Sequence, residues 1–194
     1  TSAINAAFNR SIAFSENSRY QQAIEASLSA LEGTKNCSCD DDYRENILLN
    51  AVECYQSASR DFLDKGFFNR SIDYSERCIA LLRQKPEQYS DQLAKTYLAL
   101  GSAQNLNGNS RLAIESGIKG LKVRQIVNPL DSRIGSHYGQ IIGYYLGLFD
   151  TLNTRLYLEQ WEAFHRRIGG KASLQGRLNL ANYWSTYYEL RGET

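Results

Sequence analysis

The stretch YLALGSAQNLNGNSRLAIESGIKGL, residues 97–121, contains two apolar segments with helical spacing on either side of the polar sequence NLNGNS. The second segment carries Gly117 and Gly120, where an isolated helix would lose about 1 kcal/mol per glycine relative to alanine. A side chain must therefore be less favourable than none at these positions, as at a close contact between helices. We predict that the small face of a helix over residues 111–126 packs against a helix over residues 91–106.

Similar apolar segments and turns recur along the chain. Turn-forming residues stand at positions 18, 66, 108, 150 and 192, so the successive spacings are 48, 42, 42 and 42 residues. Unrelated helices joined by arbitrary loops would not be expected to show such regularity. A fixed period of this length indicates a repeat architecture, in which each unit buries its apolar face against its neighbours.

The residues around the first turn have the spacing of a known repeat. Tyr97, Leu100 and Gly101 are followed by Gly108 and then by Ala113, an order that resembles the tetratricopeptide (TPR) signature. The usual TPR period is about 34 residues, so each unit here has about eight residues more and is similar to the long-helix subclass of the family. The resemblance implies an all-α fold, a right-handed TPR-like superhelix of antiparallel helix pairs (an α-solenoid).

The repeat register predicts a single TPR-like array over residues 1–194, with units over 3–35, 42–85, 90–127 and 132–168 and a partial unit over 173–194. Asp42 with Glu45 three residues later predicts a capping box at the start of the second unit. The partial last unit, a first residue that is not methionine and the absence of methionine predict that the sequence is a fragment of a longer protein.

Charge and hydropathy argue against two classes of partner. The net charge is +1, from 22 basic and 21 acidic residues, and no basic block is present, so we expect no nucleic-acid partner. No apolar run approaches the roughly 18 residues of a membrane-spanning helix, and no intact signal peptide precedes the first unit, so we expect no membrane association. These features favour a cytoplasmic protein, and a mature exported domain is the alternative. Three N-x-S sequons, at Asn9, Asn36 and Asn69, matter only in the exported case.

The four cysteines are too few and too unevenly spaced for a secreted disulfide framework, so we expect reduced thiols. The sequence CSCDDD at 37–42 has thiols beside carboxylates, which could hold zinc or copper. Zinc normally takes four ligands, and no motif supplies the others, so we favour a loop followed by a helix cap and predict no metal site. Cys54 and Cys78 occupy helical positions that are typical of packing thiols.

No catalytic signature accompanies the repeats. His137 and His165 belong to opposite helices of one predicted hairpin, and no serine or cysteine lies in a G-x-S-x-G context. We therefore predict that the chain is not an enzyme, has no catalytic residues and needs no cofactor.

In the TPR family, ligands usually lie in a concave groove lined by the first helix of each unit. Transferring those positions implies a partner-binding set that consists of Gln56, Arg60, Lys95, Ser102, Asn105, His137, Gln140, Tyr144, Asn179 and Asn182. Amide side chains offer both a donor and an acceptor, which suits an extended peptide backbone. We expect a protein-protein interaction module that binds a peptide or partner protein. The alternative is a sensory or regulatory domain that binds a signalling peptide or small ligand and controls an effector domain outside this sequence.

One subgroup of the family captures C-terminal carboxylates with basic and amide side chains on the first helices. This chain has Phe8, Ile12 and Ala99 at three of those positions, and only Lys95 fits, so capture of a carboxylate tail is not expected.

Aromatic residues gather near the end of the chain, at Tyr183, Trp184, Tyr187 and Tyr188. Spacings of three and four residues favour a core position, whereas aromatic enrichment is also typical of interfaces. We favour the core. Because the fifth unit lacks a second helix, part of this surface is expected to stay uncovered and to allow self-association.

Overall fold

The computed structural model describes residues 2–193, and every regular element that it assigns within this range is helical. The chain divides into two compact units, residues 1–84 and 85–194. Unit 1 contains helices α1 (Ser2–Glu16), α2 (Tyr20–Thr34), α3 (Asp41–Asp64) and α4 (Phe68–Leu82). Unit 2 contains α5 (Ser90–Leu106), α6 (Ser110–Val127), α7 (Ile134–Gly147), α8 (Thr151–Ile168), the short 3-10 helix η1 (Gly169–Lys171) and α9 (Leu174–Leu190).

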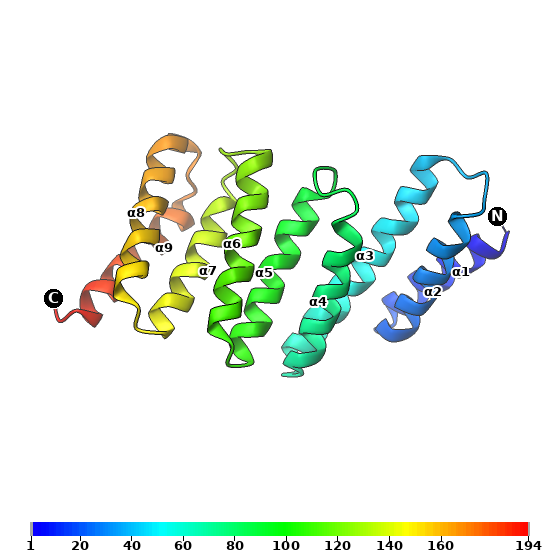
Figure 1. The fold of residues 1–194 in the computed structure, drawn as a ribbon, viewed down its shortest axis with the longest axis horizontal. Helices are drawn as coiled ribbons and strands as arrows, with labels where there is room; N and C mark the ends of the chain where they lie inside the picture. The colour runs from blue at the N-terminus through cyan, green and yellow to red at the C-terminus, as the bar shows by residue number, and fades with distance from the viewer. Residues whose placement is uncertain (1, 194) are drawn as a thin grey trace. The chain divides into compact units, whose positions relative to one another are not determined.

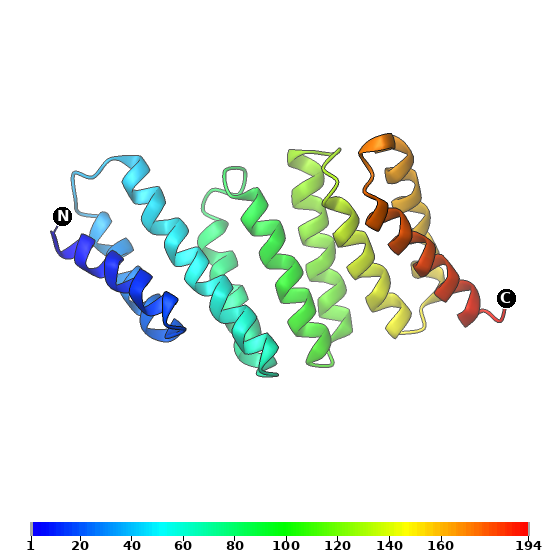
Figure 2. The same cartoon turned by 180° about the vertical axis from the view of Figure 1, so that it is seen from behind.

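Consecutive helices form antiparallel pairs: α1 with α2, α3 with α4, α5 with α6, and α7 with α8 (Figure 1). Within unit 2, the first helices α5, α7 and α9 lie side by side on one face, which Figure 2 shows from behind in green, yellow-green and orange-red. Whether the two units form one continuous array over residues 1–194 stays a prediction.

The turn that ends each first helix has the same backbone geometry five times. Residues 18, 66, 108, 149 and 192 all have positive φ angles, between 56° and 83°. At each turn the next residue donates its N–H to a carbonyl five residues back, as from Asn109 to Gln104 at 2.8 Å, while Gly108 donates to Asn105 at 2.9 Å. This pair of bonds is a Schellman motif, which satisfies carbonyls that the helix end would leave without partners.

The fourth turn differs by one residue from the sequence prediction. Phe149, rather than Asp150, takes the positive φ, while Asp150 caps α8 by accepting a hydrogen bond from the Asn153 N–H at 3.0 Å. Ser18 and Phe149 therefore occupy a backbone conformation that the other three turns give to glycine.

The N-cap of α3 differs from the residue that the sequence predicted. Its N-cap is Asp40, whose side chain accepts from the Tyr43 N–H at 2.7 Å, whereas the predicted capping box placed the cap at Asp42. Asp41 and Asp42 instead lie in the first turn, where their charges favour the positive end of the helix dipole.

The cysteine predictions had a mixed outcome. Cys37 and Cys39 form a disulfide in the segment between α2 and α3, so the prediction of reduced thiols is wrong for this pair. Cys54 and Cys78 are free and buried, which confirms their assignment as packing thiols. Burial raises the pKa of the Cys54 thiol to about 11, so it stays protonated at neutral pH.

Small residues bring the helices of unit 1 close together. Ala23, Ala30, Ala51 and Ala58 are fully buried. Between α3 and α4, the Ser59 hydroxyl is 2.7 Å from that of Ser75 and 3.0 Å from that of Ser71, so these buried hydroxyls satisfy one another.

The core of unit 2 centres on Trp161 of α8, which is 2% exposed. Around it pack Ile141 and Ile142 of α7 and Leu158 and Phe164 of α8.

The absence of side chains at Gly117 and Gly120 of α6 is explained more by contacts with α7, in the following hairpin, than by contacts with α5, the partner of α6 in its own hairpin. A Cβ at Gly117 would lie 2.8 Å from Cγ1 of Ile141 in α7. A Cβ at Gly120 would lie 2.7 Å from Cε1 of His137 in α7 and 3.0 Å from Cβ of Tyr97 in α5. The prediction that both glycines contact the paired helix α5 is therefore wrong for Gly117 and incomplete for Gly120, because α7 packs against the same face.

We expect Gly120→Ala to lower the free energy of unfolding by about 1–3 kcal/mol, because the added methyl group overpacks a contact among three helices. Urea unfolding followed by circular dichroism measures the change. Gly147→Ala is the matched control: apart from its chain neighbours and the nearby backbone of its own helix, no atom lies within 4 Å of its Cβ position, so alanine there should be neutral or stabilising by up to about 1 kcal/mol. Equal losses in the two variants would show that helix contact is not the reason for Gly120.

Candidate binding groove

A hollow of about 440 Å³ lies in unit 2, on the face formed by the first helices. We call it the α7–α9 hollow, because most of its lining comes from α7, from α9 and from the two residues just before α9, while Leu98 of α5, Ser132 and part of α8 complete it. Its polar lining consists of Ser132, Ser136, Gln140, His165, Ser173, Gln175, Asn179 and Tyr183. Among the described residues that line it there is no lysine, arginine, aspartate or glutamate.

The floor of the hollow depends on glycines in α7. A Cβ at Gly135 would lie 3.1 Å from Trp161 Nε1, and one at Gly139 would lie 3.4 Å from the same indole at Cη2. The missing side chains thus leave room for the Trp161 ring to pack from α8 against the α7 backbone. These positions were not among the predicted site residues, although Gly135, Gly139 and Gly143 at helical spacing were a signal that a large side chain packs there.

His165 completes the floor. Trp161 Nε1 donates a hydrogen bond to His165 Nε2 at 3.0 Å, so the neutral ring carries its proton on Nδ1. Burial, assisted by the charge of Arg177, lowers the pKa of His165. The ring is therefore neutral at neutral pH and adds no charge to the lining.

Two predicted site residues are joined by a hydrogen bond across neighbouring first helices. Gln140 Nε2 on α7 donates to Ser102 Oγ on α5 at 2.7 Å and to the Leu98 carbonyl at 3.1 Å. Gln140 lines the hollow, and Asn179 lines it from α9. The Asn179 side chain is half-buried and accepts from Gln175 Nε2 at 2.8 Å.

The remaining predicted residues are not part of the hollow. Lys95 and Asn182 are exposed on α5 and α9. Asn105 accepts a hydrogen bond from Ser110 at 2.8 Å across the turn between α5 and α6. In unit 1, Gln56 is half-buried and Arg60 is exposed, both on α3.

His137 and Tyr144 are core residues in the structure, which corrects their assignment to a partner-binding surface. His137 is fully buried because its ring fills the space that Gly120 leaves open. Tyr144 is 6% exposed, since its ring packs where Gly101 of α5 has no side chain, and burial raises its pKa to about 12. Neither side chain offers a surface to a partner in this conformation.

The aromatic cluster at the C-terminal end is divided between core and surface. Tyr187 is 3% exposed and belongs to the core, whereas Tyr188 is 44% exposed. Trp184 stacks on Tyr188 with ring centroids 5.6 Å apart. The core assignment therefore holds for Tyr187, and self-association through the exposed part of the cluster stays a prediction.

Two negative findings concern other kinds of site. Within residues 2–193, no group of three or more His, Cys, Asp or Glu side chains is placed to hold a metal ion. None of the helices in the described part of the chain is both long and apolar enough to cross a membrane.

Solved structures with the same fold are TPR-like repeat proteins. Aspartyl phosphate phosphatase F from Bacillus subtilis aligns with a TM-score of 0.63 at 15% identity, over 96% of this chain and 45% of that chain. BtubC (BKLC) from P. vanneervenii aligns with a TM-score of 0.66 at 14% identity, over 94% of this chain and 70% of that chain. The TPR-like repeats of a putative kinesin light chain from Podosopora anserina align with a TM-score of 0.62 at 14% identity, over 98% of this chain and 87% of that chain.

No protein-family model matches the chain, and a search of curated proteins finds no match. The structural likeness confirms the predicted all-α, TPR-like helical repeat fold. The long-helix subclass stays a prediction, and the chain spans less than half the length of the phosphatase.

Proposed function

We propose that this protein is an interaction module that binds an uncharged peptide segment of a partner protein in the α7–α9 hollow. The observation that supports this is the lining: amides and hydroxyls surround a hollow of about 440 Å³ without a formally charged side chain. Gln175 and Asn179 supply amide groups from α9, and Ser136 and Ser173 supply hydroxyl groups from α7 and from the residue that caps α9. Such groups match the alternating donors and acceptors of a peptide backbone, and they lack the positive charge that strengthens binding of a carboxylate or phosphate.

Selection of peptides from a random displayed library against the 194-residue chain, followed by affinity measurement with synthetic peptides, tests the proposal. Asn179→Ala, and Ser136→Trp, which fills the hollow from an exposed position, should each weaken binding at least about tenfold, equivalent to about 1.4 kcal/mol. Lys119→Ala on the exposed face of α6 is the control and should leave the affinity unchanged.

The measurement also separates this hollow from the end of the chain. If affinity survives both substitutions and is lost in Tyr188→Ala, the partner binds the C-terminal aromatic cluster and the proposed site is wrong.

A second candidate function is a regulatory domain that binds a signalling peptide or small ligand and controls an effector domain outside residues 1–194. The observation in its favour is the likeness to aspartyl phosphate phosphatase F, of which this chain spans only part. The segments that flank residues 1–194 in the full protein would distinguish the candidates, since an effector domain there would favour regulation. We propose no catalytic activity for this chain, and its cytoplasmic location also stays a proposal.

A further inference from the structure

A second hollow, of about 550 Å³, lies in unit 1 and is lined by α1 and α3 alone. Hydrogen bonds between the two helices set their register: the Tyr43 hydroxyl bonds to the Asn5 side chain, and Asn50 Nδ2 donates to Ser11 Oγ. A residue of α1 thus lies beside the residue of α3 that is 38 or 39 positions later. Four of the polar side chains along this seam are occupied in holding the two helices together.

The middle of this α1–α3 hollow is apolar. Phe8 and Ile12 line it from α1, and Leu49 lines it from α3. Ile12 is 38% exposed, and Phe8 and Leu49 are half-buried, so apolar surface remains open to solvent between the helices. An open apolar floor of this kind can take an apolar side chain of a ligand.

The C-terminal end of α1 makes this hollow acidic. Glu16 and Glu53 both line it and both are exposed, and the register places Glu16 about half a turn beyond Glu53 along the seam. No lysine or arginine lines the hollow, and no ion pair among residues 2–193 includes either glutamate. Two carboxylates without a cation therefore adjoin an apolar floor.

We propose that the α1–α3 hollow binds a peptide segment in which an apolar side chain lies next to a lysine or arginine. The apolar side chain packs on Phe8, Ile12 and Leu49, and the cation lies between Glu16 and Glu53. This inference rests on the proposed function, peptide binding, but it concerns a different surface with a different preference. The α7–α9 hollow has no charge with which to recognise such a cation, so each unit selects its own kind of peptide.

The test uses the same displayed library with the 194-residue chain, and synthetic peptides at low and high salt. We expect one class of selected peptides to carry Lys or Arg within one or two positions of Leu, Ile, Phe or Tyr, and to bind more weakly at high salt. Glu16→Gln/Glu53→Gln should weaken this class at least about tenfold, and Ile12→Ala should weaken the same class. Glu25→Gln/Glu76→Gln removes the same two charges from exposed positions on α2 and α4 and should leave the affinity unchanged.

The outcomes separate this inference from the proposed function. Recovery of only uncharged peptides that respond to Asn179→Ala would overturn the inference and leave the proposed function intact. Basic peptides that respond equally to both pairs of Glu→Gln changes would also overturn it, because net charge alone would then explain their binding. Recovery of no peptide would overturn both proposals. Unchanged circular dichroism and melting temperature in the Gln variants exclude unfolding as the cause of a loss.

Discussion

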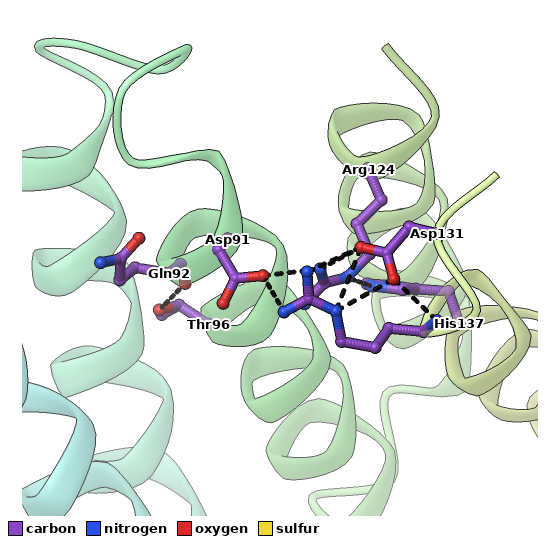
Figure 3. Close-up of polar contacts among 7 residues, drawn as sticks. Asp91, Gln92, Thr96, Arg124, Asp131 and His137 are labelled. Atoms are coloured by element: carbon purple, nitrogen blue, oxygen red, sulfur yellow. Dashed lines mark hydrogen bonds and ion pairs between the residues drawn. The ribbon is translucent and has the colours of Figure 1, made fainter. Parts of the chain in front are cut away.

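Replacing Arg124 by alanine is expected to lower the free energy of unfolding by about 3 kcal/mol, the lower end of the range for removing one partner of a buried ion pair. Arg124 is 7% exposed, and its NH1 group lies 2.7 Å from Asp91 Oδ1 and 3.0 Å from Asp131 Oδ2 (Figure 3). Its Nε donates to His137 Nε2 at 3.3 Å. One side chain on α6 thereby connects the start of α5, the loop after α6 and the buried face of α7.

The expected loss of stability comes mainly from the two carboxylates that lose a cation when Arg124 is replaced. Burial alone would raise the pKa of Asp91 and of Asp131, but the neighbouring arginines lower both, so both carboxylates are charged in the folded protein. Asp131 is only 10% exposed and would lose one of its two cations, although Arg133 still bonds to it at 2.8 Å. This remaining partner is the reason for placing the effect at the lower end of the range.

Arg133→Ala is the matched control, because Arg133 contacts the same two carboxylates but its side chain is 57% exposed. Exposed ion pairs contribute about 0–1 kcal/mol, so this variant should lose about 1 kcal/mol at most. Urea unfolding at neutral pH compares the two variants. A loss in Arg133→Ala as large as that in Arg124→Ala would show that burial does not set the strength of this network.

The repeated turns of the fold were predictable from the sequence because their backbone geometry favours particular residue types. A Schellman turn needs a positive φ, which favours glycine, and glycine stands at three of the five turns, at positions 66, 108 and 192. Ser18 and Phe149 adopt the same conformation without the matching residue, so only the spacing indicates them. This is also why the fourth turn was predicted one residue late.

The candidate site was harder to predict, because the repeat register gives the helix but not the depth of a side chain. His137 and Tyr144 belong to a first helix, as predicted, yet Gly120 and Gly101 on neighbouring helices draw their rings into the core. Such a contact depends on a residue of another helix, and the pattern within one helix does not identify that residue. Trp161 was not among the predicted site residues for the same reason. It lies on α8, the second helix of its pair, and its ring reaches the floor of the hollow only because α7 has glycines there.

The free energy of unfolding is expected to fall by up to about 3 kcal/mol as the pH is lowered from about 6.5 to 4, because His137 must stay neutral in the folded protein. Burial, reinforced by the charge of Arg124, lowers the pKa of His137 from 6.5 to about 4. A base whose pKa is lower in the folded than in the unfolded state stabilises the fold fully above the unfolded value. That contribution is lost as the pH falls from 6.5 towards 4, since the unfolded chain binds the proton first.

The carboxylates of the same network affect the free energy of unfolding at lower pH. The pKa values of Asp91 and Asp131 are lowered from 3.8, so their contribution is present above that value and is lost only as the pH falls below it. A fall in stability between pH 6.5 and 4 is therefore expected from histidine, and a further fall below about pH 4 from the aspartates.

Nuclear magnetic resonance separates the two histidines of the chain, because His165→Gln leaves His137 as the one remaining imidazole signal. That signal should stay in its neutral position throughout the range in which an exposed histidine titrates, and urea unfolding of the same variant should retain most of the loss between pH 6.5 and 4. The neutral state has a structural cause, because Nε2 of His137 accepts the hydrogen bond from Arg124 and a protonated ring would place two donors face to face. A His137 signal that titrates near pH 6.5, with stability flat above pH 4, would contradict the buried acceptor and with it the joining of α6 to α7 through Arg124.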